Sequence, residues 1–146
     1  MSPSPEQSPP PPKLLLLDHV VLEVRDPLGS LAFYQAILGT EPVRQAEFEQ
    51  GDAPFPSARV GQGTIIDFFP PAMWRDKVVP ANPNHVCLTT DQATAEAVEQ
   101  RLAAREVPVH TRRPRTFGAQ GYGTSYYFND PDGVTIEVRY YPAQGE

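Results

Sequence analysis

The sequence has little of several features, and each scarcity excludes a class of protein. Its 146 residues include one cysteine, Cys87, so no internal disulfide holds the fold. The densest apolar run spans only residues 14–17, far below the ~20 residues that cross a bilayer. Basic residues are few, with 12 Lys and Arg against 18 Asp and Glu, a net charge of −6. We therefore expect no membrane or nucleic-acid partner, and the single cysteine fits a cytoplasmic location.

Proline, by contrast, is in excess, and most of the excess is local. Six of the 18 prolines lie in residues 1–12 and four more in residues 70–83. A proline- and serine-rich segment cannot bury apolar surface, so residues 1–12 are predicted to be a disordered tail. They also lack the basic and apolar regions of a secretory signal. Residues 70–83 are predicted to be a connector.

Two stretches of the chain repeat one order of elements, βαβββ. The first is predicted to be a strand, a helix between Asp26-Pro27 and Gly39, and three strands, at residues 13–24, 27–38, 41–48, 58–60 and 63–69. The second is predicted to have the same elements at residues 84–90, 91–104, 107–110, 124–129 and 135–141. A glycine-rich loop is expected at residues 115–123.

Matched segments support an internal duplication. Residues 18–22 match residues 84–88 at an offset of 66, and residues 65–68 match residues 135–138 at an offset of 70. The sequence therefore predicts a single domain over residues 13–146. Its first module covers about residues 14–69, the linker residues 70–83, and its second module about residues 84–141.

Each module places one histidine and one carboxylate on the same face of its sheet. Strand alternation sets His19 and Asp67 opposite the helix side in the first module, and His85 and Glu137 in the second. Imidazole and carboxylate together suit Zn²⁺, Mn²⁺, Fe²⁺, Co²⁺ or Ni²⁺. A lone histidine is more often a hydrogen-bonded core residue, but the repetition of the pair favours a divalent metal site.

Four segments resemble the vicinal oxygen chelate superfamily of glyoxalases, bleomycin-resistance proteins and dioxygenases. They are LDHVVLEVRD (17–26), FYQAILG (33–39), NHVCL (84–88) and YFNDPDGVTIEVRYY (127–141). The resemblance implies an α+β fold in which two βαβββ modules form a cupped, eight-stranded mixed sheet with the helices on its outer face. It also implies a homodimer whose modules pair within one chain or between two.

The resemblance further implies metal ligands at His19, His85 and Glu137, with Asp67 as the fourth. Glutamate is usual at the fourth position, and aspartate is one methylene shorter. The metal would chelate two neighbouring oxygens of a small-molecule substrate and stabilise developing negative charge. Asp67 or Glu137 is then the candidate general base.

Four further residues are candidates for substrate binding. Phe69 and Tyr127 share the metal-facing sides of their strands, Trp74 lies in the connector, and Arg115 opens the glycine-rich loop. Arginine there could neutralise an anionic substrate. Trp74 could close over a ligand or contact a second subunit.

Three functions fit this pattern. The first is a glyoxalase-like, metal-dependent isomerase or lyase. The second is an extradiol-type dioxygenase, which would use Fe²⁺ and a triad of two histidines and one carboxylate. The third is a non-catalytic drug-binding protein of the bleomycin-resistance type, which would not need the four polar residues.

Overall fold

A computed structural model describes residues 16–143, and the predicted tail at residues 1–12 lies outside them. The first module contains β1 (His19–Glu23), α1 (Pro27–Leu38), β2 (Glu41–Val43), α2 (Gln45–Glu49), β3 (Ser57–Arg59) and β4 (Ile65–Phe69). A short 3-10 helix, η1 (Pro71–Met73), starts the connector. The second module contains β5 (Val86–Thr89), α3 (Gln92–Ala104), β6 (Thr111–Gly118), β7 (Gly121–Asn129) and β8 (Thr135–Tyr140).

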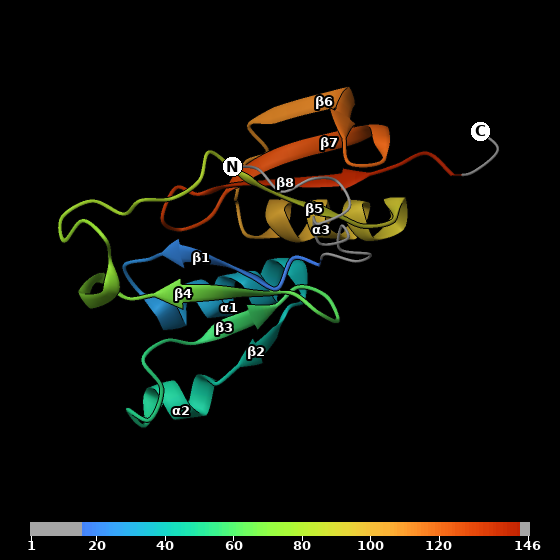
Figure 1. The fold of residues 1–146 in the computed structure, drawn as a ribbon. Helices are drawn as coiled ribbons and strands as arrows, with labels where there is room; N and C mark the ends of the chain where they lie inside the picture. Colours follow the sequence, from blue (N-terminus) through green and yellow to red (C-terminus); the bar gives the residue numbers. More distant parts are fainter. Residues whose placement is uncertain (1–15, 144–146) are drawn as a thin grey trace, which may run out of the picture.

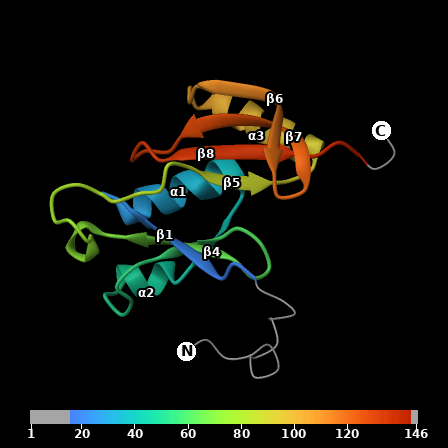
Figure 2. The same ribbon diagram turned by 45° about the horizontal axis from the view of Figure 1, so that its top comes forward.

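Each module folds into a four-stranded mixed sheet. The strand orders are β1-β4-β3-β2 and β5-β8-β7-β6, and the first pair in each order is parallel while the others are antiparallel. Figures 1 and 2 show the two sheets one above the other, joined on one side by the connector. The predicted α+β fold with two modules is confirmed, its eight strands being divided between two sheets.

The two long helices begin where the sequence predicts. Asp26 caps α1 by accepting a hydrogen bond from the Gly29 backbone N–H at 3.1 Å, and Pro27 stands at the first helical position. Gly39 ends α1 with a φ of 71°, in the left-handed region that favours glycine. Asp91 caps α3 in the same way, accepting from the Thr94 N–H at 2.8 Å.

Within residues 16–143, no helix is long and apolar enough to cross a membrane.

Three predicted elements differ from the structure. The strand expected over residues 41–48 ends at Val43, because Arg44 adopts a left-handed φ of 60° and the helix-favouring segment behind it forms α2. The strand expected at residues 107–110 starts only at Thr111. The expected glycine-rich loop is instead the hairpin of β6 and β7, which turns at Gly121 with a φ of 98°.

One hydrophobic core spans both modules. Residues on the helix-facing sides of both sheets are buried together, among them Leu22, Phe68, Phe128 and Ile136. The modules also meet through polar contacts, since Tyr34 of α1 donates a hydrogen bond to Asp130 after β7 at 2.8 Å. The opposite faces of the two sheets remain for chemistry.

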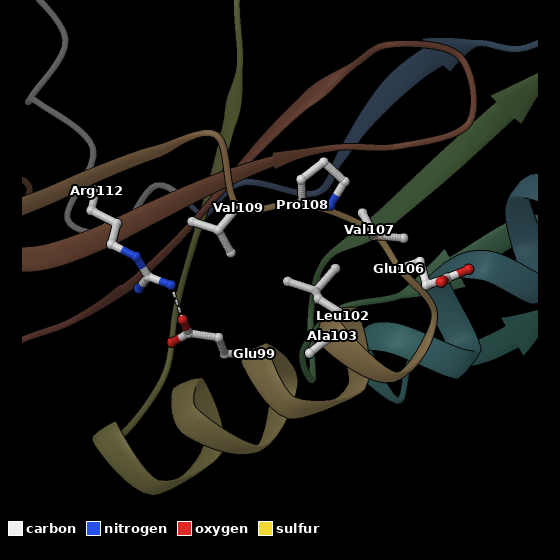
Figure 3. A pocket seen from close by; sticks show the side chains of 8 residues that line it. All are labelled: Glu99, Leu102, Ala103, Glu106, Val107, Pro108, Val109 and Arg112. Atoms are coloured by element: carbon white, nitrogen blue, oxygen red, sulfur yellow. Dashed lines mark hydrogen bonds and ion pairs between the residues drawn. The ribbon is translucent and has the colours of Figure 1, made fainter.

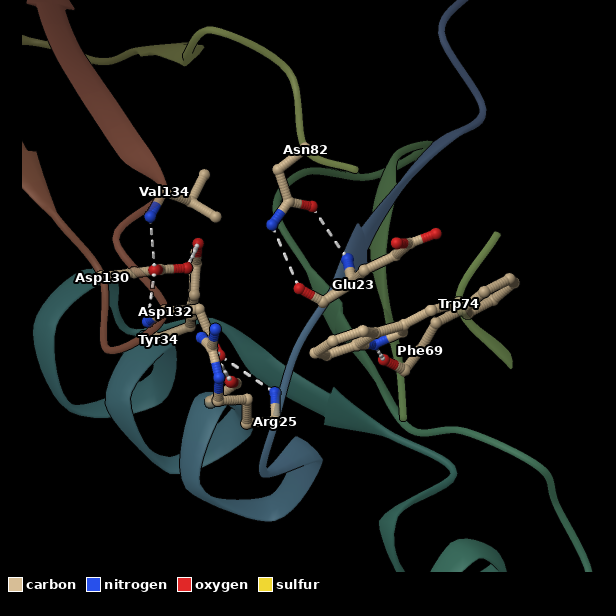
Figure 4. A network of polar contacts seen from close by, with 10 residues as sticks. Glu23, Arg25, Tyr34, Phe69, Trp74, Asn82, Asp130, Asp132 and Val134 are labelled. Carbon is tan, nitrogen blue, oxygen red and sulfur yellow. Dashed lines mark hydrogen bonds and ion pairs between the residues drawn. The ribbon is translucent and has the colours of Figure 1, made fainter. Parts of the chain in front are cut away.

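The connector is fastened to the first module by Glu23 (Figure 4). The carboxylate of Glu23 is buried and accepts hydrogen bonds from the backbone N–H groups of Arg75 at 3.0 Å and Ala81 at 2.7 Å. The Asn82 side chain meanwhile pairs with the Glu23 backbone in both directions. The path of the connector is therefore fixed by the last residue of β1.

Candidate functional site

The first module brings His19 and Asp67 together on the face turned away from the helices. His19 opens β1, and Asp67 lies in the middle of β4, across from Val21 in the parallel register. Their facing atoms, Nε2 of His19 and Oδ2 of Asp67, are 4.0 Å apart. Asp67 is 5 % exposed, whereas half of the His19 side chain is open to solvent.

The second module repeats the pair with His85 and Glu137. His85 directly precedes β5, and Glu137 of β8 lies across from Cys87. Nε2 of His85 and Oε1 of Glu137 are 3.3 Å apart. The diagonal placement is the same as in the first module, since each histidine stands two residues before the direct partner of the acid.

Both histidines are oriented by the residue that precedes them. Nδ1 of His19 lies 2.6 Å from Oδ1 of Asp18, and Nδ1 of His85 lies 2.8 Å from Oδ1 of Asn84. An oxygen of either kind accepts, so Nδ1 is the donor in both pairs and Nε2 is the nitrogen on the carboxylate side of the ring. Metal-binding histidines are typically oriented through their second nitrogen in this manner.

A serine holds each carboxylate. Ser57 on β3 donates to Oδ1 of Asp67 at 2.6 Å, and Ser125 on β7 donates to Oε2 of Glu137 at 2.6 Å. In both modules the second carboxylate oxygen, Oδ2 of Asp67 or Oε1 of Glu137, faces the histidine. Sequence reasoning missed both serines, because only the strand register shows which β3 and β7 residues face the acids.

Arg139 distinguishes the second module from the first. It is 4 % exposed and donates to Oε2 of Glu137 from Nη2 at 3.0 Å, while its other donors reach the carbonyls of Thr116 and Phe117. Burial alone would raise the pKa of Glu137, but hydrogen bonds from Ser125 and Arg139 outweigh it and lower the pKa. Glu137 is therefore held as a carboxylate.

The hairpin of β6 and β7 closes tightly over Arg139. A Cβ added at Gly118 would overlap the guanidinium of Arg139 and crowd the hydroxyl of Tyr141. The hairpin and the Glu137 face together enclose a pocket of about 330 Å³, whose lining includes His85, Glu137 and Arg139. Cys87 also lines this pocket, where burial and the Glu137 charge raise the pKa of its thiol to about 11.

The donor geometry fits a metal better in the second module. Two ligands that share an ion at about 2.1 Å lie ~3.0–3.4 Å apart at octahedral or tetrahedral angles. The His85–Glu137 distance falls in that range, and the His19–Asp67 distance of 4.0 Å exceeds it. Within residues 16–143 of one chain, no three His, Cys, Asp or Glu side chains gather at metal-binding distance. The two pairs thus remain separate half-sites.

The four predicted substrate-binding residues take different positions. Phe69 packs on Phe55 with ring centroids 4.8 Å apart. Trp74 is 5 % exposed and donates its indole N–H to the Phe69 carbonyl at 3.1 Å, which holds the connector against the end of β4 (Figure 4). Arg115 is exposed and its guanidinium lies 3.6 Å from the Tyr122 ring centre.

Tyr127 alone among these four touches a metal-ligand candidate. It lies directly across from Glu137, and its ring meets the His85 ring edge-on at a centroid distance of 5.9 Å. Burial and the neighbouring Glu137 carboxylate raise its pKa above the usual value. Its hydroxyl therefore stays protonated and is a donor.

Comparison with known proteins agrees with this architecture. The model of the family described as Glyoxalase/Bleomycin resistance protein/Dioxygenase superfamily matches residues 16–138. An integron cassette protein from the mobile metagenome of V. cholerae is 28 % identical, with a TM-score of 0.70 over 89 % of this chain and 98 % of that one. Lactoylglutathione lyase from Agrobacterium tumefaciens is 22 % identical, with a TM-score of 0.63 over 94 % and 100 %. Oxidase ChaP-H1 is 20 % identical, with a TM-score of 0.64 over 90 % and 100 %.

Proposed function

The chain belongs to the Glyoxalase/Bleomycin resistance protein/Dioxygenase superfamily, and we propose that it is a divalent-metal-dependent isomerase or lyase of that superfamily. Its substrate would be a small molecule with two neighbouring oxygens. One observation carries the proposal: both modules contain a histidine oriented through Nδ1 and a buried carboxylate held by a serine. Hydrogen bonds that only stabilised the fold would not require the same histidine, carboxylate and serine in both modules.

The donor set suits Zn²⁺, Ni²⁺, Mn²⁺, Co²⁺ or Fe²⁺. His19, His85 and Glu137 would hold the ion, with Asp67 as the fourth and most distant ligand. A bound ion would act as a Lewis acid toward the two substrate oxygens. Oε1 of Glu137 and Oδ2 of Asp67 accept no hydrogen bond from the serines, so whichever of the two does not hold the ion could accept a substrate proton as the general base.

We propose that the two half-sites are completed between two copies of the chain in a homodimer. The half-sites lie on separate sheets within one chain, and three ligands do not gather within residues 16–143. In a twofold-symmetric dimer, the first module of each chain would face the second module of its partner and yield two equal sites.

The pocket at the second half-site supports an oxygen-rich substrate with one anionic or electron-rich group. Arg139 supplies a positive charge beside Glu137, and Cys87 and Tyr141 supply less polar walls. A lactoylglutathione lyase shares the fold, which favours the glyoxalase-like reaction. The oxidase with the same fold keeps an extradiol-type dioxygenase as the second candidate.

Metal analysis of the purified protein tests the proposal. We expect about one divalent ion per chain in the wild type, and loss of it in His85→Ala. The matched control is His110→Ala, since His110 is exposed and, among residues 16–143, its ring is hydrogen-bonded only to Thr111 and Asn129. Equal metal content in wild type and His85→Ala would overturn the proposed site, and a protein that binds drug without metal would favour the bleomycin-resistance type.

Co-expression of His19→Ala and His85→Ala chains tests the sharing of the site. Random pairing of the two chains leaves about one quarter of the shared sites with both histidines, so part of the metal content and turnover returns. A site built within one chain would regain nothing. Turnover of a thiol–ketoaldehyde adduct indicates the lyase, and oxygen consumption with catechols indicates the dioxygenase.

A further inference from the structure

A second cavity lies between the two modules, at the ends of β3 and β5, and it shares Thr89 with the pocket at the second half-site. Its volume is about 230 Å³. One wall comes from the end of α1 and from β3, and the other from the end of β5, the start of α3 and β8, elements whose arrangement Figure 1 shows. The cavity is smaller than the ~300–1,000 Å³ of drug-sized sites, so it suits a molecule of a few heavy atoms.

The lining of this intermodule cavity has two chemically distinct parts. Apolar side chains from both modules form one part: Leu38, Val60, Leu88, Val98 and Val138. Hydroxyl groups and one cation form the other: Thr40, Thr89, Thr90, Thr94 and Arg59. An apolar surface beside a cluster of donors is the arrangement that orients a small amphipathic ligand.

Two of the polar groups lack the partners that the rest of the protein supplies. Thr40 is 7 % exposed, and its Oγ1 is the buried side-chain atom without a hydrogen-bond partner in the part of the chain that the structure describes. Buried hydroxyls are almost always bonded, so this one points to a missing partner. Within the described residues, the side chain of Arg59 donates only to the carbonyl of Gln62, at 3.2 Å.

The cation of Arg59 is also free of a counter-ion among residues 16–143. Glu41 stands across from it in the β2–β3 register, yet no carboxylate there comes within 4.0 Å of its guanidinium. The pocket of about 380 Å³ in Figure 3 provides the contrast, since its cation, Arg112, is already paired with Glu99. A free guanidinium matches the planar, singly charged carboxylate.

We propose that the intermodule cavity binds a short-chain monocarboxylate. Its carboxylate would pair with Arg59 and accept hydrogen bonds from the hydroxyls of Thr40, Thr89 and Thr90, and its alkyl chain would lie on the leucine and valine side chains. A single cation fits a monoanion better than a phosphate dianion. Because the lining comes from both modules, bound ligand would fasten one module to the other.

Butyrate is the probe for this site, with butanol and butylamine as controls of the same length. We expect butyrate to raise the melting temperature of the full chain saturably at millimolar concentrations, and both controls to leave it unchanged. In NMR spectra, the methyl signals of Leu88 and Val98 should shift with the same midpoint.

Two variants separate binding from folding. Arg59→Gln should weaken butyrate binding at least tenfold and retain the wild-type metal content, while Arg105→Gln, an exposed arginine on the far end of α3, should bind like the wild type. Thr40→Val should raise the melting temperature without ligand, because it removes the unpartnered hydroxyl, and also weaken binding. Equal butyrate affinity in Arg59→Gln and wild type, or no saturable shift, would overturn the proposal whatever the fate of the metal site.

Discussion

The two modules hold a carboxylate beside a histidine through different hydrogen-bond partners. In the first, Asp67 is held by Ser57 alone and stands 4.0 Å from its histidine. In the second, Glu137 is held by Ser125 and Arg139 and stands 3.3 Å from its histidine. Phe69 occupies the position of Arg139 in the first module, two residues after the acid. Both modules thus share the histidine–acid–serine set, and the second has in addition a buried cation and a longer carboxylate.

Removing the charge that only the second module has should produce the largest effect. Arg139→Ala leaves Glu137 buried without its cation and frees two hairpin carbonyls, so the free energy of unfolding should fall by about 3–5 kcal/mol. Denaturant unfolding measures it. Arg105→Ala, on an exposed arginine, should stay within about 0.5 kcal/mol. If Arg139→Ala lowered the free energy of unfolding by no more than this control, the buried pair would contribute little to stability.

The serines should respond unequally to the same deletion. Ser57→Ala removes the hydroxyl that bonds to Asp67 and should lower the free energy of unfolding by about 1.5–3 kcal/mol, the usual value for a bond to a charged group. Ser125→Ala should cost less, because Arg139 still donates to Glu137. Chemical denaturation of the two variants side by side gives the comparison, and an equal cost would mean that Arg139 does not compensate.

Lengthening the acid of the first module and shortening the acid of the second should change the metal affinity in opposite directions. Asp67→Glu adds the methylene that the first module lacks, so it should tighten the proposed metal site by about tenfold, close to 1.4 kcal/mol. Glu137→Asp should weaken it. Calorimetric titration with Zn²⁺ measures both changes. If both variants bound Zn²⁺ more tightly, or neither did, the histidine–carboxylate distance would not be the cause.

The smallest effect concerns the residue before each histidine, Asp18 in one module and Asn84 in the other. The hydrogen bond to Asp18, followed by the charge of Asp67, raises the pKa of His19. His19 therefore adds stability that is fully present below its unfolded pKa of about 6.5 and is lost as pH rises through the higher folded pKa.

Asp18→Asn should lower the His19 pKa and reduce that acidic-side stability, while the charge of Asp67 retains part of it. The NMR titration of the His19 ring protons gives the pKa directly. Asp52→Asn, which changes an exposed carboxylate on the loop after α2, is the matched control and should leave the titration unchanged. An unchanged midpoint in Asp18→Asn would contradict the assignment of Asp18 as the partner.

Much of the fold and of the candidate site follows from local patterns. Alternation places His19 with Asp67 and His85 with Glu137 on the faces away from the helices, and Asp26 marks the start of α1. These features depend on periodicity and capping, which neighbouring residues determine.

The remaining features depend on register and on single backbone angles. Ser57 and Ser125 reach the acids only because of how β3 and β7 pair with their neighbours, and Ser125 does so diagonally, since Tyr127 stands opposite Glu137. The early end of β2 depends on the left-handed Arg44. Neither a cross-strand register nor one dihedral angle is visible in hydrophobic spacing.

Gly118 links the surface of the second module to its chemistry. Any side chain there would displace Arg139, whose guanidinium holds both the hairpin carbonyls and Glu137. A side chain at position 118 therefore requires the guanidinium of Arg139 and the hydroxyl of Tyr141 to move. An exposed hairpin is usually the part of a fold most tolerant of change, but here variation in its tip is restricted by the carboxylate beneath it.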